Sequence, residues 1–220
     1  MRVVAVVVAA SAHALTPVGG VPMVTCAVRT LLAGAAVERV IVIAADALRP
    51  AIERACATER IDVRSPAALH VGAHIEQRPG YAGSDDLVTA GVEDVVVLHD
   101  ACRPLAPDDL AVAVVEAVRG GHGVAVPAMR LTDTVKSVDD RGIVTGTPDR
   151  AALRVLQTPI ALRAGLLPAD VGEDPLTVIR RHTAAGGEVH TVPGHPAAFA
   201  VRSAWDLELA ELIADGRIRL

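Results

Sequence analysis

The chain has 220 residues, 51% of them hydrophobic and 21% charged, with a formal net charge of −5. This length fits one domain over residues 1–220, and the scarcity of aromatic residues (one Trp, one Tyr, one Phe) predicts an aliphatic core. The acidic balance and the few aromatic side chains argue against nucleic-acid binding, and the longest apolar run, 3–10, is too short to span a membrane. Three widely spaced cysteines indicate buried, reduced thiols, so we expect a cytoplasmic protein with neither a nucleic-acid nor a membrane partner.

Valine-rich runs bounded by turn residues predict strands that are covered on both faces. These runs span 3–10, 39–45, 94–100, 123–129 and 188–194. Helical patterns lie between them, at about 23–35, 47–58, 66–77, 107–119, 174–185 and 204–215. The alternation of strand and helix predicts an α/β fold with a doubly wound, mostly parallel, Rossmann-like sheet.

The loop after the first strand stands where many α/β proteins hold a phosphate group. It contains Ser11, His13 and Thr16 but no Lys or Arg, and the next such residue along the chain is Arg29. Backbone N–H groups and the following helix N-terminus attract an anion, but one helix end offers only about half a unit of charge. The loop is therefore either an anion site without its usual cation or a plain connection between strand and helix.

The stretch LHDACRP, residues 98–104, places Asp100 where a buried strand ends. A carboxylate in this position is a natural Mg²⁺ ligand, because Mg²⁺ takes one or two carboxylates together with phosphate oxygens. Arg103 is in a position to pair with Asp100 or with a phosphate group. The alternative is a helix-capping aspartate with a structural arginine.

Residues 131–159, LTDTVKSVDDRGIVTGTPDRAALRVLQTP, break the alternation and predict strand, turn, strand and strand. The VDDRG stretch is a hairpin turn signal. An antiparallel β-arm of this kind often forms a dimer contact. Its polar residues include Thr134, Arg150 and Thr158, which are either part of a binding site or ordinary surface groups.

These stretches, in this order, resemble the 2-C-methyl-D-erythritol 4-phosphate cytidylyltransferase family over nearly the whole chain. LHDACRP resembles the family's HDAARP, and residues 131–159 resemble its DT-x-K segment, hairpin, T-x-x-R-x-x-L and QTPQ. WDLELAELI resembles its closing D-L-x-x-A helix. The resemblance implies a nucleotidyltransferase fold, a homodimer joined by the arm, and Mg²⁺ as cofactor. The implied reaction joins CTP to methylerythritol phosphate and releases pyrophosphate.

The resemblance also implies roles for individual residues. Asp100 matches the metal-binding Asp of HDAARP, and Arg103 matches the Arg of that motif. Arg150 matches the Arg of T-x-x-R, which reaches the sugar phosphate in the partner subunit's site. Thr134 and Thr158 match the threonines that line the same pocket. Asp100 and Arg150 are therefore the expected catalytic residues, and the acceptor side of the site is largely kept.

The nucleotide side departs from the family pattern. The family opens with A-A-G-x-G-x-R and then P-K, whereas this chain has Ser11 and His13 for the two glycines, Leu15 near the Arg, and no match for P-K. Ser11 and His13 are the substrate-binding candidates of this shortened loop. In the family, the Arg of the first motif and the Lys of P-K stabilise the charge of the triphosphate. Loss of one such electrostatic group typically lowers the rate by a factor of about 10²–10³.

The other nucleotide motifs are also incomplete. The base-binding motif G-G-x-x-R-x-x-S aligns best with residues 64–71, without its Arg or Ser, and T-D-D-A-S aligns with residues 172–176, without its Thr. The family also has a lysine shortly before its closing D-L-x-x-A helix, and this position aligns with Ala200 here. Arg202 lies two residues further on, and we expect a strand to direct it to the opposite face.

Three hypotheses follow from these observations. The first is a cytidylyltransferase, for which the missing cations predict weak or lost activity. The second is a catalytically inactive paralogue that binds a ligand or a partner protein. The third is an enzyme for another phosphorylated substrate, with His13, Arg64 or Arg202 as its cations.

Overall fold

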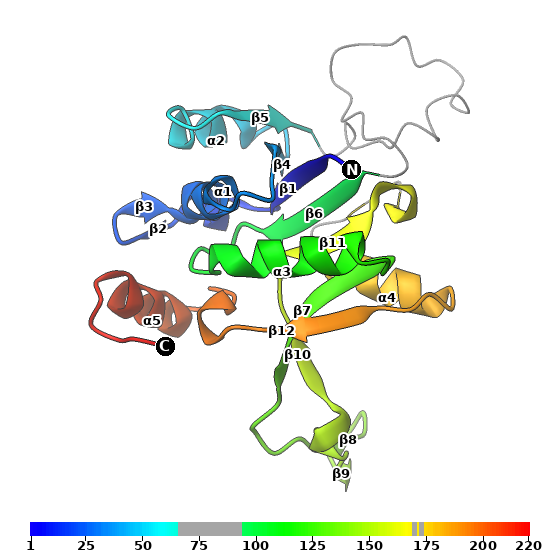
Figure 1. Ribbon diagram of the computed structural model, residues 1–220. Coiled ribbons are helices and arrows are strands. Elements are labelled where there is room, and N and C mark those ends of the chain that lie inside the picture. The colour runs from blue at the N-terminus through cyan, green and yellow to red at the C-terminus, as the bar shows by residue number, and fades with distance from the viewer. Residues whose placement is uncertain (66–93, 169–170, 172–173) are drawn as a thin grey trace.

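The computed structural model describes residues 1–65, 94–168, 171 and 174–220, and its centre is an eight-stranded mixed sheet (Figure 1). The strand order is β10-β7-β11-β6-β1-β4-β5, and β12 pairs with β7. The bounds are β1 (Val3–Ala9), β4 (Arg39–Ala44), β5 (Ile61–Arg64), β6 (Val95–Asp100), β7 (Val124–Arg130), β10 (Arg154–Leu156), β11 (Ile160–Arg163) and β12 (His190–Pro193). Parallel pairs join β1 to β4 and β6, β4 to β5, and β12 to β7. The predicted α/β fold with a mostly parallel sheet is confirmed.

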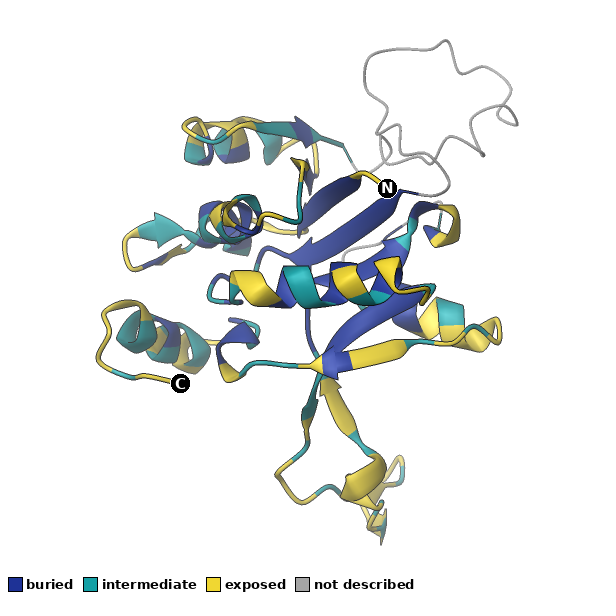
Figure 2. Ribbon diagram, in the orientation of Figure 1, coloured by how far each residue is buried: buried dark blue, intermediate teal, exposed yellow. Residues whose placement is uncertain are grey.

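Two apolar layers cover the two faces of this sheet. The helices are α1 (Met23–Ala33), α2 (Arg49–Ala55), α3 (Asp108–Arg119), α4 (Thr177–Ala184) and α5 (Ala204–Ala214). Successive β1 side chains alternate between the layers, because strand residues point to opposite faces in turn. Val3, Ala5 and Val7 join one cluster with residues of α1, α2 and α3, whereas Val4 and Val6 join another with α4. All seven β1 residues are therefore buried (Figure 2).

The structure differs from the sequence-based prediction in its strands and in the burial of its cysteines, and one predicted helix falls outside the described residues. Strands β5 and β11 were not predicted, and β11 lies antiparallel between β6 and β7. Its apolar run, Ile160–Leu162, is too short to give a strand pattern. The helix expected at 66–77 lies outside the described residues. All three cysteines are free, as expected, but only Cys56 is fully buried.

The arm is shorter than the predicted 131–159 segment. Strands β8 (Ser137–Val138) and β9 (Val144–Gly146) form its antiparallel hairpin, which projects away from the sheet in Figure 1. Gly142 adopts φ +78° in the turn, a conformation that glycine adopts without strain. The third predicted strand is β10, which pairs with β7 in the main sheet. Across the parts of the chain that the structure describes, no helix is long and apolar enough to cross a membrane.

Candidate functional site

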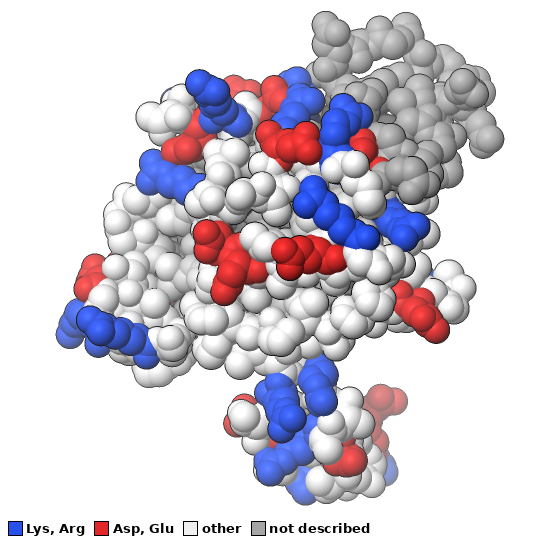
Figure 3. Space-filling view, in the orientation of Figure 1, with Lys and Arg blue, Asp and Glu red and all other residues white. Residues whose placement is uncertain are grey.

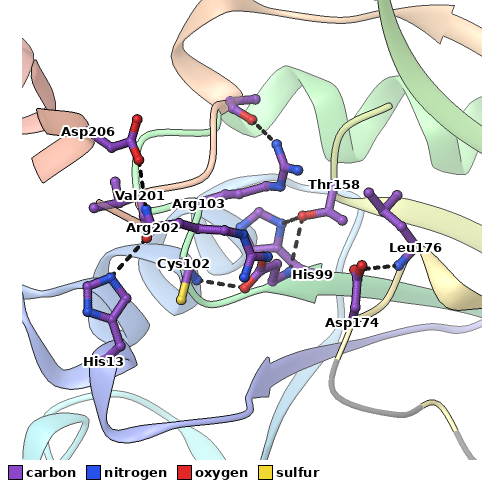
Figure 4. Close-up of polar contacts among 12 residues, drawn as sticks. His13, His99, Cys102, Arg103, Thr158, Asp174, Leu176, Val201, Arg202 and Asp206 are labelled. Carbon is purple, nitrogen blue, oxygen red and sulfur yellow. Dashed lines mark hydrogen bonds and ion pairs between the residues drawn. The ribbon is translucent and has the colours of Figure 1, made fainter. Parts of the chain in front are cut away.

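Asp100 is the last residue of β6, and it lies beside the end of β1 because Val8 is its neighbour in the parallel pair. Its side chain is only 8% exposed. One carboxylate oxygen, Oδ1, accepts the backbone N–H of Cys102 at 2.9 Å, and Oδ2 accepts Nη2 of Arg202 at 2.7 Å (Figure 4). Asp100 is thus a fixed, buried carboxylate at the carboxyl edge of the parallel strands, where ligands bind in open α/β sheets.

Arg202 contradicts the expectation that it points away from the site. Its guanidinium pairs with Asp100, and its side chain is 58% exposed. Ala200 and Arg202 are two positions apart, and residues with this spacing in a strand point to the same face, so the argument itself was mistaken. In addition, residues 199–202 do not form a strand. The backbone N–H of Arg202 donates to Oδ2 of Asp206 at 3.1 Å, next to the capping box that Ser203 and Asp206 form at the start of α5. The helix start therefore fixes the position from which Arg202 reaches Asp100.

Arg103 is buried beside this ion pair. Its Nη1 donates to the backbone carbonyl of Ala198 at 2.5 Å, which ties the end of β6 to the short 3-10 turn Pro196–Ala198. Burial lowers the pKa of Arg103. The pairing with Asp100 that the sequence left open for Arg103 is made by Arg202 instead.

Thr158 supports Asp100 from within the sheet. The residue is completely buried, and its Oγ1 accepts the backbone N–H of Asp100 at 3.1 Å. The same oxygen lies 3.0 Å from Nδ1 of His99. Burial, reinforced by the charge of Arg103, lowers the pKa of His99 from 6.5 to about 3, so its ring is neutral near pH 7. The sequence reasoning did not single out His99, although it is part of the LHDACRP stretch.

The opening loop connects to the same region through His13. This loop contains the 3-10 turn η1 (Ala12–Leu15), and Ser11 at its start is exposed and makes no side-chain capping bond. Nε2 of His13 lies 3.0 Å from the carbonyl oxygen of Val201, so it donates, and Thr16 Oγ1 lies 3.3 Å from Nδ1. His13 therefore joins the loop to the segment that carries Arg202.

Arg150 and Thr134 lie on the arm, and one chain does not bring them to Asp100. Nη1 of Arg150 donates to the carbonyl of Thr132 at 2.8 Å. Arg150 lines a cavity of about 560 Å³, and together with Thr134 it lines a neighbouring cavity. Figure 3 shows Lys and Arg side chains gathered on the arm. The residues concerned on or beside the arm are Arg130, Lys136, Arg141, Arg150 and Arg154.

The residues around Asp100 fit a magnesium ion that is shared with a substrate. No group of three or more His, Cys, Asp or Glu residues that could hold a metal occurs among the described residues. A single carboxylate suffices for Mg²⁺ when phosphate oxygens and water supply the other ligands. Each Asp100 oxygen accepts one hydrogen bond here and keeps a second lone pair. The aligned base-binding stretch from residue 66 onward, and residues 172–173, lie outside the described residues.

Comparison with known proteins agrees with the motif pattern. A family model described as 2-C-methyl-D-erythritol 4-phosphate cytidylyltransferase matches residues 7–215. The chain belongs to this cytidylyltransferase family. It is 41% identical over 216 residues to the 2-C-methyl-D-erythritol 4-phosphate cytidylyltransferase of Nocardia farcinica, covering 96% of this chain and 89% of that protein. It is 35% identical over 208 residues to the Rhodococcus jostii protein of the same name, covering 92% and 86%.

Solved structures of this cytidylyltransferase family share the fold. The 4-diphosphocytidyl-2C-methyl-D-erythritol synthase of Anaerococcus prevotii superposes with a TM-score of 0.74 at 20% identity, covering 97% of this chain and 98% of that chain. The Thermus thermophilus 2-C-methyl-D-erythritol 4-phosphate cytidylyltransferase gives 0.69 at 22% identity, covering 98% and 100%. The family resemblance and fold inferred from the motifs are confirmed.

Proposed function

We propose that the protein transfers a cytidylyl group from CTP to 2-C-methyl-D-erythritol 4-phosphate and releases pyrophosphate, at a low rate. The observation that carries this proposal is the buried, fixed Asp100 at the strand edge of a chain 41% identical to a relative that bears this name. The low rate follows from residues 10–16, which contain no Lys or Arg. Each missing electrostatic group of this kind costs about 10²–10³ in rate.

Asp100 supplies a fixed negative charge to the proposed centre. The backbone N–H of Cys102 orients Oδ1, and Thr158 holds the Asp100 backbone. Mg²⁺, when bound, would neutralise phosphate charge and orient the triphosphate, with Asp100 as its protein ligand. In the proposed reaction Asp100 would help to hold the triphosphate while an oxygen of the acceptor's phosphate attacks the α-phosphate in line, and pyrophosphate would leave on the opposite side.

Arg150 and Thr134 are proposed to act in a homodimer, through the arm of the other subunit. Three apolar side chains of the hairpin, Val138, Ile143 and Val144, are 58–59% exposed, which favours their burial against a second copy. In such a dimer Arg150 would bind the phosphate group of the acceptor, because its planar fork matches two phosphate oxygens.

The first experiment measures pyrophosphate release from CTP, methylerythritol phosphate and Mg²⁺ by the purified protein. We expect slow turnover that Asp100→Asn abolishes and that Asp46→Asn, at a surface ion pair, leaves unchanged. No turnover, together with no heat of CTP binding up to millimolar concentration from a folded protein, would reject the proposal. The catalytically inactive paralogue would then be the better interpretation.

A second experiment tests whether the arm acts on the other subunit. Dimers formed between Asp100→Asn and Arg150→Ala chains contain one site with both residues intact. Random pairing makes half of the dimers mixed, so activity should return to about a quarter of the wild-type value in a two-fold symmetric dimer. Two inactive variants that stay inactive when mixed would show that Arg150 does not act across the interface.

A further inference from the structure

We propose that Arg202 is the nucleotide-phosphate ligand of this chain and takes the place of the cations missing from the opening loop. In the absence of nucleotide it pairs with Asp100, and it exchanges this carboxylate for phosphate oxygens when a magnesium–polyphosphate binds. This inference rests on the proposed function, and it names the residue that recognises the polyphosphate.

The position of Arg202 is the first argument. Its Nη2 lies 2.7 Å from Oδ2 of Asp100, the residue proposed to hold Mg²⁺, so a phosphate bound to that ion lies within reach of the guanidinium. The opening loop contacts the same segment, since His13 Nε2 donates to the carbonyl of Val201 at 3.0 Å. Figure 4 shows Arg202 between the His13 side of the loop and the end of β6.

The freedom of the Arg202 side chain is the second argument. Its side chain is 58% exposed, whereas that of Asp100 is 8% exposed. A partly exposed ion pair is weak, so its arginine is readily transferred to another anion. Asp100 does not depend on Arg202 for its orientation, because Cys102 N–H and Thr158 hold it independently. The backbone of Arg202 stays anchored by Asp206 at the start of α5 while the side chain moves.

The third argument is that, among the described residues, no other Lys or Arg forms an ion pair with Asp100. Lys136, the only lysine of the chain, lies on the arm and donates to Thr147. Arg103 is buried, and its Nη1 is committed to the carbonyl of Ala198. In the part of the chain that the structure describes, Arg202 is the one Lys or Arg that forms an ion pair with Asp100.

Calorimetric titration with tripolyphosphate, with and without Mg²⁺, tests the proposal without requiring turnover. Arg202→Ala should weaken binding about 10–100-fold, the effect expected for loss of a charge-assisted hydrogen bond. Arg202→Lys should recover part of the affinity, because lysine keeps the charge and lacks the fork. Arg119→Ala, an exposed arginine in the last turn of α3, is the matched control and should bind as the wild type does.

The outcomes separate this inference from the proposed function. Unchanged tripolyphosphate binding by Arg202→Ala would overturn the inference, and tighter binding would overturn it and show that Arg202 shields Asp100. Failure of the folded wild type to bind tripolyphosphate at millimolar concentration would overturn it as well. Arg202-dependent binding without pyrophosphate release from CTP would uphold the phosphate site and reject the transferase. Turnover with kcat/KM unchanged in Arg202→Ala would uphold the transferase and reject the role of Arg202.

Discussion

The buried His99 makes the stability of the fold depend on pH in a defined window. Burial and the charge of Arg103 lower the pKa of His99 from 6.5 to about 3 in the folded protein. Between these two values the unfolded chain holds a proton on this ring and the folded chain does not. The free energy of unfolding is therefore fully retained above pH 6.5 and falls as the pH decreases toward 3.

The magnitude follows from proton linkage. One extra proton on the unfolded state lowers the free energy of unfolding by about 1.4 kcal/mol for each pH unit below 6.5, so the loss at pH 5 is about 2 kcal/mol. A typical domain has only about 5–15 kcal/mol of stability, which makes a loss of this size easy to measure. Carboxylates with lowered pKa values, such as Asp139 and Asp206, titrate below their ordinary value of 3.8 and contribute at lower pH.

Urea denaturation at several pH values between 7.5 and 5 provides the assay. We expect His99→Asn to be less stable than the wild type at pH 7.5 but to lose the pH-dependent decline, because asparagine keeps a group that can bond Thr158 and does not titrate. His182→Asn, on the outer helix α4, is the matched control and should keep the wild-type slope. A slope that survives in His99→Asn would refute the assignment, since the extra proton would then bind elsewhere.

Three further predictions concern the supports of the site and the arm. Thr158→Val removes the acceptor of the buried Asp100 N–H, so unfolding by urea should become easier by about 1–3 kcal/mol; a change below about 0.5 kcal/mol would contradict the structural role of this hydroxyl. Ser203→Ala removes the capping box of α5 and should lower stability by about 1 kcal/mol in the same assay, whereas an unchanged unfolding midpoint would show that the cap is not needed. Val144→Glu places a charge on the exposed apolar hairpin and should convert the proposed homodimer to monomers in analytical ultracentrifugation without changing the circular dichroism spectrum; a persistent dimer would place the interface elsewhere.

Local patterns were sufficient to predict the body of the fold. Valine-rich runs that alternate with helical segments can bury both sheet faces only in a layered α/β arrangement, and β1, β4 and β6 lie where the runs predicted them. The position of Asp100 followed in the same way, since a polar residue that ends a buried parallel strand must lie at the carboxyl edge. The lack of cations in the opening loop was also visible directly in its residues.

Other features depend on contacts between distant segments. Asp100 and Arg202 are 102 residues apart, and their pairing requires the turn before α5 to lie against the end of β6. The short strand β11 likewise lies between β6 and β7, and Thr158, which precedes it, is completely buried. Periodicity reports which face of an element is apolar, but it carries no information on which long polar side chain reaches across a strand edge. The sequence alone therefore revealed which cations the loop had lost, and the tertiary structure decided which arginine stands beside Asp100.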